Sequence, residues 1–333
     1  MNGAGPDLEA LRASDLPSLA RLWNASGALG AAHPLTQRVL EQWWASPDTD
    51  PALCWAARRR GILHGALLAR APRRRWSDPR VGHVSLLVVT AASRGQGLGE
   101  ALWQAACVGL RERGRSLLRL GADPDHLLPG VPGVTGAASW RFLLARGVVP
   151  GDLEADVLVD LRLPEVGRLP PHATLHVVDD DPDAAQAFVQ RCFPGRWADD
   201  LARYAAAGTT LLTLREGATT LAFAAVFRQD DALLGPSLTW ASALPGPVGG
   251  IGPLGVDPAV RGRGLGLRLV AEALDWHRVR GARDVVLDWS RLTGFYGRLG
   301  GRVWRTYQRA EAALGPLRSA RAYTPLEAQP SDA

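Results

Sequence analysis

Lysine is absent from this sequence of 333 residues, so all 38 basic residues are arginine. A Walker P-loop needs Gly-Lys-Ser/Thr, and the missing lysine therefore excludes that class of nucleotide-binding protein. Cysteine is also scarce: Cys54, Cys107 and Cys192 are far apart and form no C-x-x-C pair. The sequence predicts neither a disulfide framework nor a zinc site, and the seven scattered histidines give no reason to expect another metal.

Long apolar runs are missing as well. No run approaches the roughly 18 residues that a membrane-spanning helix needs, and residues 1–7 lack the basic and then apolar layout of a secretory signal. Together with 47% hydrophobic residues, these absences predict a folded cytoplasmic protein without a membrane partner. The length favours two domains of ordinary size.

The positive charge does not indicate a nucleic-acid partner. The net charge is +5, and arginines cluster at residues 58–60 and 73–75. Neither cluster is interleaved with aromatic residues or lies in a known nucleic-acid motif, so we expect solvated surface at both.

Two glycine-rich stretches of similar spelling each follow a predicted strand and open a predicted helix. We call them the first cradle (residues 94–99) and the second cradle (residues 261–266). Glycines let successive backbone N–H groups converge on an anion, and the helix that follows adds its positive end. The residues are Val89, Arg94, Gly95, Gln96, Gly97, Leu98 and Gly99 in the first copy, and Val256, Arg261, Gly262, Arg263, Gly264, Leu265 and Gly266 in the second.

The same order of predicted elements surrounds each cradle. Residues 53–57 and 62–69 predict a hairpin, residues 81–89 a strand, and residues 98–110 a helix. In the second half the corresponding segments are 209–214 with 219–228, 249–256 and 265–280. No regular structure is assigned to residues 193–207 or 229–247.

A dinucleotide fingerprint fits both cradles poorly. It needs G-x-G-x-x-G directly after the strand, whereas the third glycine falls one place early at Gly266 and again at Gly99. Asp288 does stand at roughly the distance of a ribose-binding acid, so this alternative remains open.

The pattern Val-x-Pro-x-x-Arg-Gly-x-Gly-Leu-Gly is complete at residues 256–266 and looser at residues 89–99. It resembles the acetyl-CoA-binding motif of the GNAT acyltransferases, and the order of elements in each half is similar to that family. The resemblance implies an α+β fold of two tandem domains. Each would have a mixed, mostly antiparallel sheet with a splay at the fourth strand, flanked by helices. We expect domains at residues 1–165 and 166–314 and a mobile tail at residues 315–333.

The resemblance also implies acetyl-CoA as co-substrate. Backbone amides of the second cradle would hold the pyrophosphate of CoA, and the strand ending at Leu254, Gly255 and Val256 would pair with the pantetheine arm. Pro253 lacks an N–H, so the strand should part from its neighbour there or carry a bulge. Whether the first cradle binds CoA stays open.

The two halves differ at the position of a general acid. The family places a tyrosine in the pattern Phe-Tyr-x-x-x-Gly, present here at residues 295–300 with Tyr296. The first half has Leu143 instead, in Phe-Leu-x-x-x-Gly at residues 142–147. A weak acid can assist a departing thiolate, so Tyr296 is the candidate acid, unless it only packs in the core, and Asp288 is a candidate base or an exposed strand-end residue. Trp289 stands near the place where the family commonly has a CoA-contacting Asn.

The sequence therefore predicts an N-acetyltransferase that moves acetyl directly to a primary amine of a small molecule or peptide. The second half would be active and the first degenerate. The alternatives are a non-catalytic protein that binds or senses acyl-CoA, and transfer from aminoacyl-tRNA. Trp197, Tyr204 and Trp240 would line the acceptor side or pack in the core. The identity of the acceptor and the oligomeric state stay open.

Overall fold

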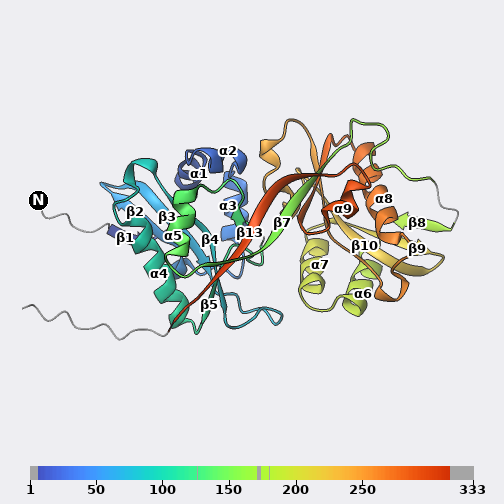
Figure 1. The fold of residues 1–333 in the computed structure, drawn as a ribbon. Helices are drawn as coiled ribbons and strands as arrows, with labels where there is room; N and C mark the ends of the chain where they lie inside the picture. Colours follow the sequence, from blue (N-terminus) through green and yellow to red (C-terminus); the bar gives the residue numbers. More distant parts are fainter. Residues whose placement is uncertain (1–6, 126, 171–173, 180, 316–333) are drawn as a thin grey trace, which may run out of the picture.

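The computed structural model describes residues 7–125, 127–170, 174–179 and 181–315 (Figure 1). The first half of the chain contains β1 (Asp7–Ala10), α1 (Leu16–Asn24), α2 (Ala28–Ala32), α3 (Gln37–Trp44), β2 (Trp55–Arg59), β3 (Ile62–Arg70), β4 (Val81–Val89), α4 (Leu98–Glu112), β5 (Leu117–Leu120), β6 (Val131–Pro132), α5 (Ala137–Leu144) and β7 (Val149–Asp160). The second half contains β8 (Leu175–Val178), α6 (Pro182–Cys192), α7 (Arg196–Ala206), β9 (Thr210–Glu216), β10 (Thr219–Arg228), β11 (Val248–Val256), α8 (Leu265–Val279), β12 (Asp284–Ser290), α9 (Thr293–Gly297) and β13 (Arg302–Ala313).

The order of elements follows the sequence prediction, with one helix that it missed. The stretch at residues 193–207 contains α7, whose buried residues Ala198, Leu201 and Tyr204 recur at helical spacing. Residues 229–247 contain two short 3₁₀ turns, Pro236–Leu238 and Ala241–Ala243. Of the tail expected at residues 315–333, all but Gly315 lies outside the described residues.

β7 and β13 join the halves by changing places (Figure 1). β7, the last strand of the first half, pairs with β12 of the second half, with Asp160 opposite Asp284. β13, the last strand of the second half, reaches β5 of the first half, with Ala313 opposite Leu117. The two exchanged strands also pair with each other. The result is one sheet of order β1-β2-β3-β4-β5-β13-β7-β12-β11-β10-β9-β8. The boundary expected at residues 165 and 166 stays a prediction, because the exchange places strands of both segments in one sheet.

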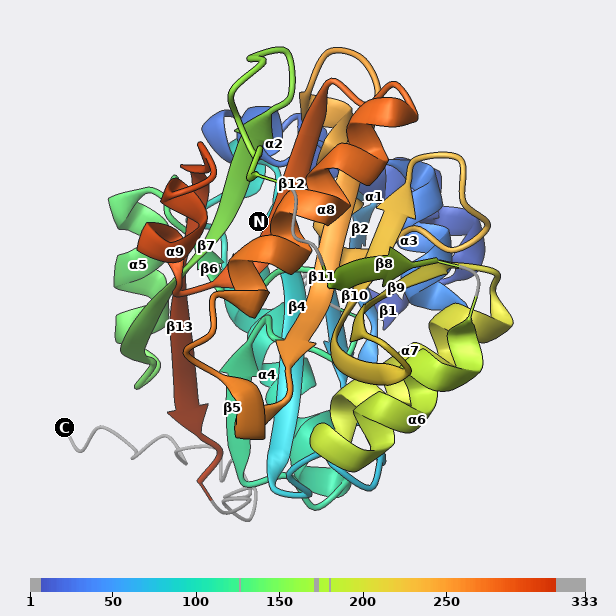
Figure 2. The ribbon, with the colours of Figure 1, turned by 90° about the vertical axis from the view of Figure 1, so that its right-hand side faces the viewer.

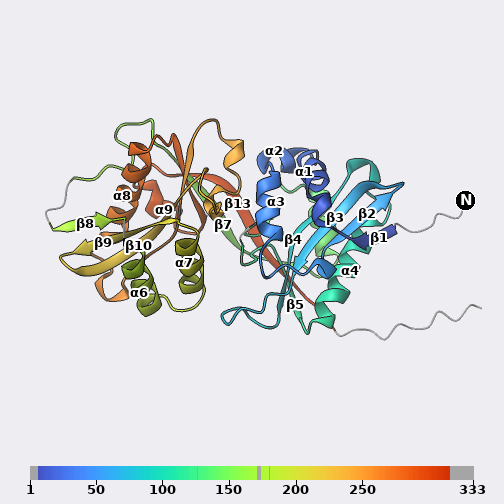
Figure 3. The ribbon, with the colours of Figure 1, turned by 180° about the vertical axis from the view of Figure 1, so that it is seen from behind.

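Helices cover both faces of the sheet in each half. In the first half, α4 buries Leu102 and Leu110 against one face, while α1 and α3 bury Leu19 and Leu40 against the other (Figure 3). In the second half, α8 covers one face and α6 and α7 cover the opposite one (Figure 2). Alternating strand residues supply both cores, because successive side chains point to opposite faces.

The sheet opens next to each cradle. β11 and β12 run parallel and pair only from Val248 to Ile251. The ladder between β11 and β10 shifts register at the same place, so Gly252 and Pro253 bulge. Both expectations for Pro253, a parting of the strands and a bulge, are confirmed. β4 and β5 likewise pair only up to Val84. We call the opening between β11 and β12 the splay.

Candidate active site

The second cradle has the geometry of an anion site. Gly262 and Gly264 have φ values of +86° and +76°, and a Cβ added at either would meet nothing within 4 Å. Gly264 is the N-cap of α8, and no side chain caps that helix. The first backbone N–H groups of α8 are therefore open to a ligand, and the helix end is positive. The residues present fit a pyrophosphate.

The first cradle is built in the same way. Gly95 and Gly97 have φ values of +73° and +81°, and a Cβ added at either would likewise meet nothing within 4 Å. Gly97 is the uncapped N-cap of α4. Backbone geometry therefore does not distinguish the two cradles, and the difference between the halves must lie beyond them.

The third glycines align the two halves in space. A Cβ on Gly266 would lie 3.4 Å from the Phe295 ring and 3.5 Å from Val256. A Cβ on Gly99 would lie 3.4 Å from the Phe142 ring and 3.9 Å from Val89. Since these phenylalanines directly precede Tyr296 and Leu143, the tyrosine and the leucine occupy equivalent positions.

Tyr296 lies on the α8 side of β12. It is 7% exposed and belongs to the core cluster that contains Leu265 and Leu287. Burial raises the pKa of its phenol, the negative charge of Asp288 raises it further, and a hydrogen bond with Ser290 opposes both. The phenol is therefore protonated at neutral pH and can act as a proton donor.

Asp288 lies at the apex of the splay. It is the first residue of β12 beyond the stretch that pairs with β11, and its Oδ1 lies 3.1 Å from where a Cβ on Gly252 would be. Because Leu287 packs with Tyr296, the side chain of Asp288 points to the opposite face, toward α7. Burial and, next, the charge of Asp156 raise the pKa of Asp288 to about 7. Such a carboxyl group can exchange a proton at neutral pH.

Asp156 and Tyr307 stand behind Asp288, and the sequence did not single them out. The Tyr307 hydroxyl donates to Asp156 Oδ2 at 2.6 Å, and both residues are buried. Burial raises the pKa of Asp156 to about 6 against the effect of that hydrogen bond. No local signal set Asp156 apart, since the same strand also contains Asp152, Glu154 and Asp160.

The first half has no carboxylate at the position of Asp288. Gly121 is the first residue beyond the pairing of β4 with β5. A Cβ there would lie 2.4 Å from the Leu128 carbonyl oxygen and 3.0 Å from the backbone nitrogen of Gly130. The long loop after β5, which contains β6, therefore packs directly on this position.

The loop of residues 229–247, which precedes β11, is held by hydrogen bonds to the first half. Gln42 of α3 exchanges two 2.8 Å hydrogen bonds with the backbone of Leu234, and Ser242 donates to the carbonyl of Pro34 at 3.2 Å. Residues 229–247 thus lie against the first half (Figure 3). Of the aromatic residues considered for the acceptor side, Tyr204 and Trp240 are 1% and 4% exposed, and Trp197 packs partly buried against the same core as Tyr204.

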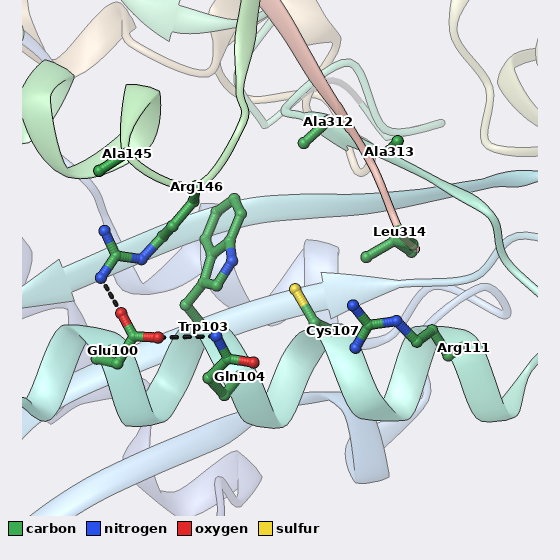
Figure 4. Close-up of a pocket in the computed structure, with 10 residues that line it drawn as sticks. All are labelled: Glu100, Trp103, Gln104, Cys107, Arg111, Ala145, Arg146, Ala312, Ala313 and Leu314. Atoms are coloured by element: carbon green, nitrogen blue, oxygen red, sulfur yellow. Dashed lines mark hydrogen bonds and ion pairs between the residues drawn. The ribbon is translucent and has the colours of Figure 1, made fainter. Parts of the chain in front are cut away.

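A cavity of about 660 Å³ lies away from the splay, along α4 of the first half (Figure 4). Glu100 and Arg146 pair across one end of it, and Trp103 and Cys107 face it from α4. In the second half the linker after β7 covers the matching side of α8: Gly167 lies against Leu274, and Arg278 donates to the Val166 carbonyl. The cavity is therefore present along α4 because no segment of the described chain covers that side of the helix as the linker covers α8. Neither Tyr296 nor Asp288 lines it.

Two properties of the described residues bear on membrane and metal binding. No helix among them is both long and apolar enough to cross a membrane. They include no group of three or more His, Cys, Asp or Glu side chains that could hold a metal ion.

The sequence matches the model of the Acetyltransferase (GNAT) family twice, over residues 16–127 and 176–300. The two matches contain one cradle each and together cover most of the chain. No curated protein matches the sequence.

Solved structures match along nearly the whole chain. The glucosamine N-acetyltransferase region of a fungal multi-domain GH3 beta-N-acetylglucosaminidase has a TM-score of 0.81 and 24% identity, covering 93% of this chain and 38% of that one. This chain thus spans well under half of that protein. A GCN5-related N-acetyltransferase from Sphaerobacter thermophilus has a TM-score of 0.70 and 20% identity, covering 94% and 98% of the two chains. A tandem GNAT protein of the clavulanic acid pathway has a TM-score of 0.67 and 20% identity, covering 93% and 99%. At these identities the matches show a shared fold.

Proposed function

The chain belongs to the GNAT family of acetyltransferases, and we propose that it transfers acetyl from acetyl-CoA directly to a primary amine at the splay of the second half. One observation carries this proposal: the second half places a tyrosine and a carboxylate on opposite sides of the splay. The equivalent positions of the first half hold Leu143 and Gly121.

The co-substrate fits the second half along its length. The open N–H groups at the start of α8 would hold the pyrophosphate, with Arg261 and Arg263 beside them. Beyond Ile251 the backbone of β11 has no partner in β12, so residues 254–256 can pair with the pantetheine amides. When bound, acetyl-CoA supplies an activated acyl group. The first cradle has the same open geometry, so we propose that it can hold a second CoA without turnover.

Asp288 and Tyr296 would divide the proton transfers. Asp288 takes a proton from the incoming ammonium, so that the amine nitrogen has a free electron pair for attack on the thioester carbonyl. Tyr296 gives its phenolic proton to the departing thiolate, which leaves as a thiol. The acylated nitrogen then gives its surplus proton, through water, to the Tyr296 phenolate, and Asp288 releases to solvent the proton that it took from the ammonium. A general acid or base of this kind contributes about 10²–10⁴-fold to the rate.

The acceptor is proposed only as a class, a primary amine of a small molecule or peptide. Asp288 faces away from α8 and toward α7, on the side where β7 of the first half lies next to β12. The acceptor would enter from that side. Glucosamine is the first candidate to test, because a structural neighbour is named for acetylating it.

The test is release of CoA thiol over a panel of amines that contains glucosamine, amino acids, polyamines and peptides. We expect wild type to turn over at least one amine, and Tyr296→Phe to lose about 100-fold or more in kcat. Equal turnover by Tyr296→Phe would remove the tyrosine from the mechanism. Binding of two equivalents of acetyl-CoA without transfer would favour the alternative, a protein that senses acyl-CoA. Failure to bind acetyl-CoA would refute both.

A further inference from the structure

Asp156 comes from the first half of the chain but lies next to the candidate base of the second. Its Oδ2 accepts the hydrogen bond from the Tyr307 hydroxyl, and its Oδ1 accepts one from the backbone N–H of Trp289 at 3.2 Å. The residue is 3% exposed. A buried carboxylate whose two oxygens are both held by donors has a fixed position, and it fixes its donors in turn.

The N–H of Trp289 belongs to a turn that needs such support. Trp289 has a φ of +49°, a left-handed conformation that is strained for a residue with a Cβ. The ladder between β12 and β7 shifts register between Leu287 and Ser290. The carboxylate of Asp156 accepts the N–H of Trp289 within this interruption of the ladder. Because Trp289 directly follows Asp288, this turn fixes the direction in which Asp288 leaves the strand.

In the first half a backbone carbonyl, not a side chain, accepts the hydrogen bond from the equivalent left-handed turn. Ala122, at the equivalent position, has a φ of +53°. Its N–H donates to the Leu128 carbonyl oxygen at 2.6 Å. A main-chain acceptor from a local loop thus supports the turn there, whereas the second half uses a carboxylate brought by the exchanged strand.

We propose that Asp156 is a positioning residue of the acceptor site, which holds the left-handed turn at Trp289 and so presents Asp288 to the splay. This inference rests on the proposed function, since it assigns to Asp156 a role that acts through the base of that reaction. It makes the active half dependent on one side chain of the half that lacks the acid.

The electrostatic consequence follows from the groups around Asp288. They are Asp156 from β7, Arg196 and Tyr204 from α7, Tyr296 from α9 and Tyr307 from β13. The charge of Asp156 raises the pKa of Asp288, and that of Arg196 lowers it. Removing the Asp156 charge should therefore move the acidic limb of kcat/KM to lower pH, by about one pH unit.

The experiment measures pH profiles of acetyl transfer for four full-length variants beside wild type: Asp156→Asn, Asp156→Ala, Asp288→Asn and the double variant Asp156→Ala/Asp288→Asn. Glu154→Gln is the matched control, a carboxylate two residues earlier on the same strand and 6% exposed. Thermal unfolding checks that each variant is folded. We expect Asp156→Asn, which keeps an oxygen for the Trp289 N–H, to shift the limb downward, and Glu154→Gln to leave it in place.

We expect Asp156→Ala to lose about 100-fold in kcat, because a base displaced by about 1 Å loses that much. The same change should cost nothing further once Asp288 is already Asn, since a positioning residue acts only through the base. Equal losses in both backgrounds, or an unshifted limb in Asp156→Asn, would overturn the inference and leave the proposed function intact. A wild type without the limb, or without transfer, would overturn both.

Discussion

The two halves share a glycine turn and differ at the ends of the strands beside it. Both cradles have left-handed glycines at an uncapped helix start, and both third glycines lie against a phenylalanine. Beyond the last paired strand residue, one half has Gly121 and the other Asp288. The backbone geometry of the cradle thus occurs twice, while the tyrosine and the carboxylate that we propose for the reaction occur once.

This difference teaches how a duplicated unit can divide its work. The loop after β5 lies directly against Gly121, so the first half is packed at the position where the second half has Asp288. The same half supplies β7, and with it Asp156, to the other side. If the proposed function holds, one copy lacks the reacting side chains and also supplies a supporting side chain to the other.

The largest effect should come from removing the charge of Asp288, since the equivalent residue of the first half, Gly121, has no side chain. Asp288→Asn should lower kcat/KM by about 1,000-fold at neutral pH, within the usual range for a general base. In wild type, kcat/KM should fall as pH drops below about 7, because a raised pKa leaves Asp288 protonated there. The variant should lack that limb. Asp160→Asn, at the other end of the β12 and β7 ladder, is the control. A wild-type profile retained by Asp288→Asn would show that the base lies elsewhere.

A reciprocal change in the first half should affect stability and leave the chemistry alone. Gly121→Ala should lower the free energy of unfolding by about 3 kcal/mol, from a left-handed φ and a backbone clash. The clash is with the Leu128 carbonyl oxygen, 2.4 Å from the new Cβ. Gly114→Ala, with a φ of +74° and open space, should lose only about 1 kcal/mol. Urea unfolding measures both, and equal losses would mean that the loop does not press on Gly121.

The cradles themselves allow a matched pair of variants. Gly264→Ala should raise the KM for acetyl-CoA about 30-fold, because a Cβ enters the space where backbone N–H groups meet the anion. Gly97→Ala carries the same strain, with φ values of +81° against +76°, but should leave turnover unchanged. Calorimetry of both variants also counts the CoA molecules bound. If the two variants impair turnover equally, chemistry is not confined to the second half.

The smallest effect concerns a buried histidine of the second half. His277 lies beneath Gly249, where the first half has Leu110 beneath Gly82. Burial lowers the pKa of His277 to about 4, so the unfolded chain binds more protons than the folded one below about pH 6.5, and stability falls as pH falls. From about pH 7.5 to about pH 5.5 this loss should be about 1 kcal/mol. His277→Leu should remove it from the pH dependence of urea unfolding, and an unchanged slope would contradict the assignment.

The sequence predicted those elements whose conformation is set by residues close together in the chain. Glycine spacing, apolar periodicity and Pro253 predicted both cradles, most strands and the splay, since each is set by residues near in sequence. The equivalence of Phe142 and Phe295 followed from aligning the two copies of the repeat. For α7 the signal was present in the spacing of its buried residues but was overlooked.

The partnership of Asp156 with Tyr307 could not be predicted in this way. The two residues are 151 positions apart, and they meet because β7 and β13 exchange sheets. Either strand would satisfy its hydrophobic pattern equally well in its own half, so nothing in the alternation of apolar residues distinguishes the two topologies. The catalytic roles of Tyr296 and Asp288 remain predictions that the experiments above test.

The exchange of strands also sets an order for biosynthesis. A chain emerging from the ribosome presents β5 as an open sheet edge until residues 302–313 have been made, because the strand that covers it follows all other strands of the second half. Open edges invite pairing with other chains, and domains that fold as they emerge normally escape this exposure. The first half cannot complete its sheet on emergence. We therefore expect nascent chains to depend on chaperones for longer than those of a protein whose two units close separately.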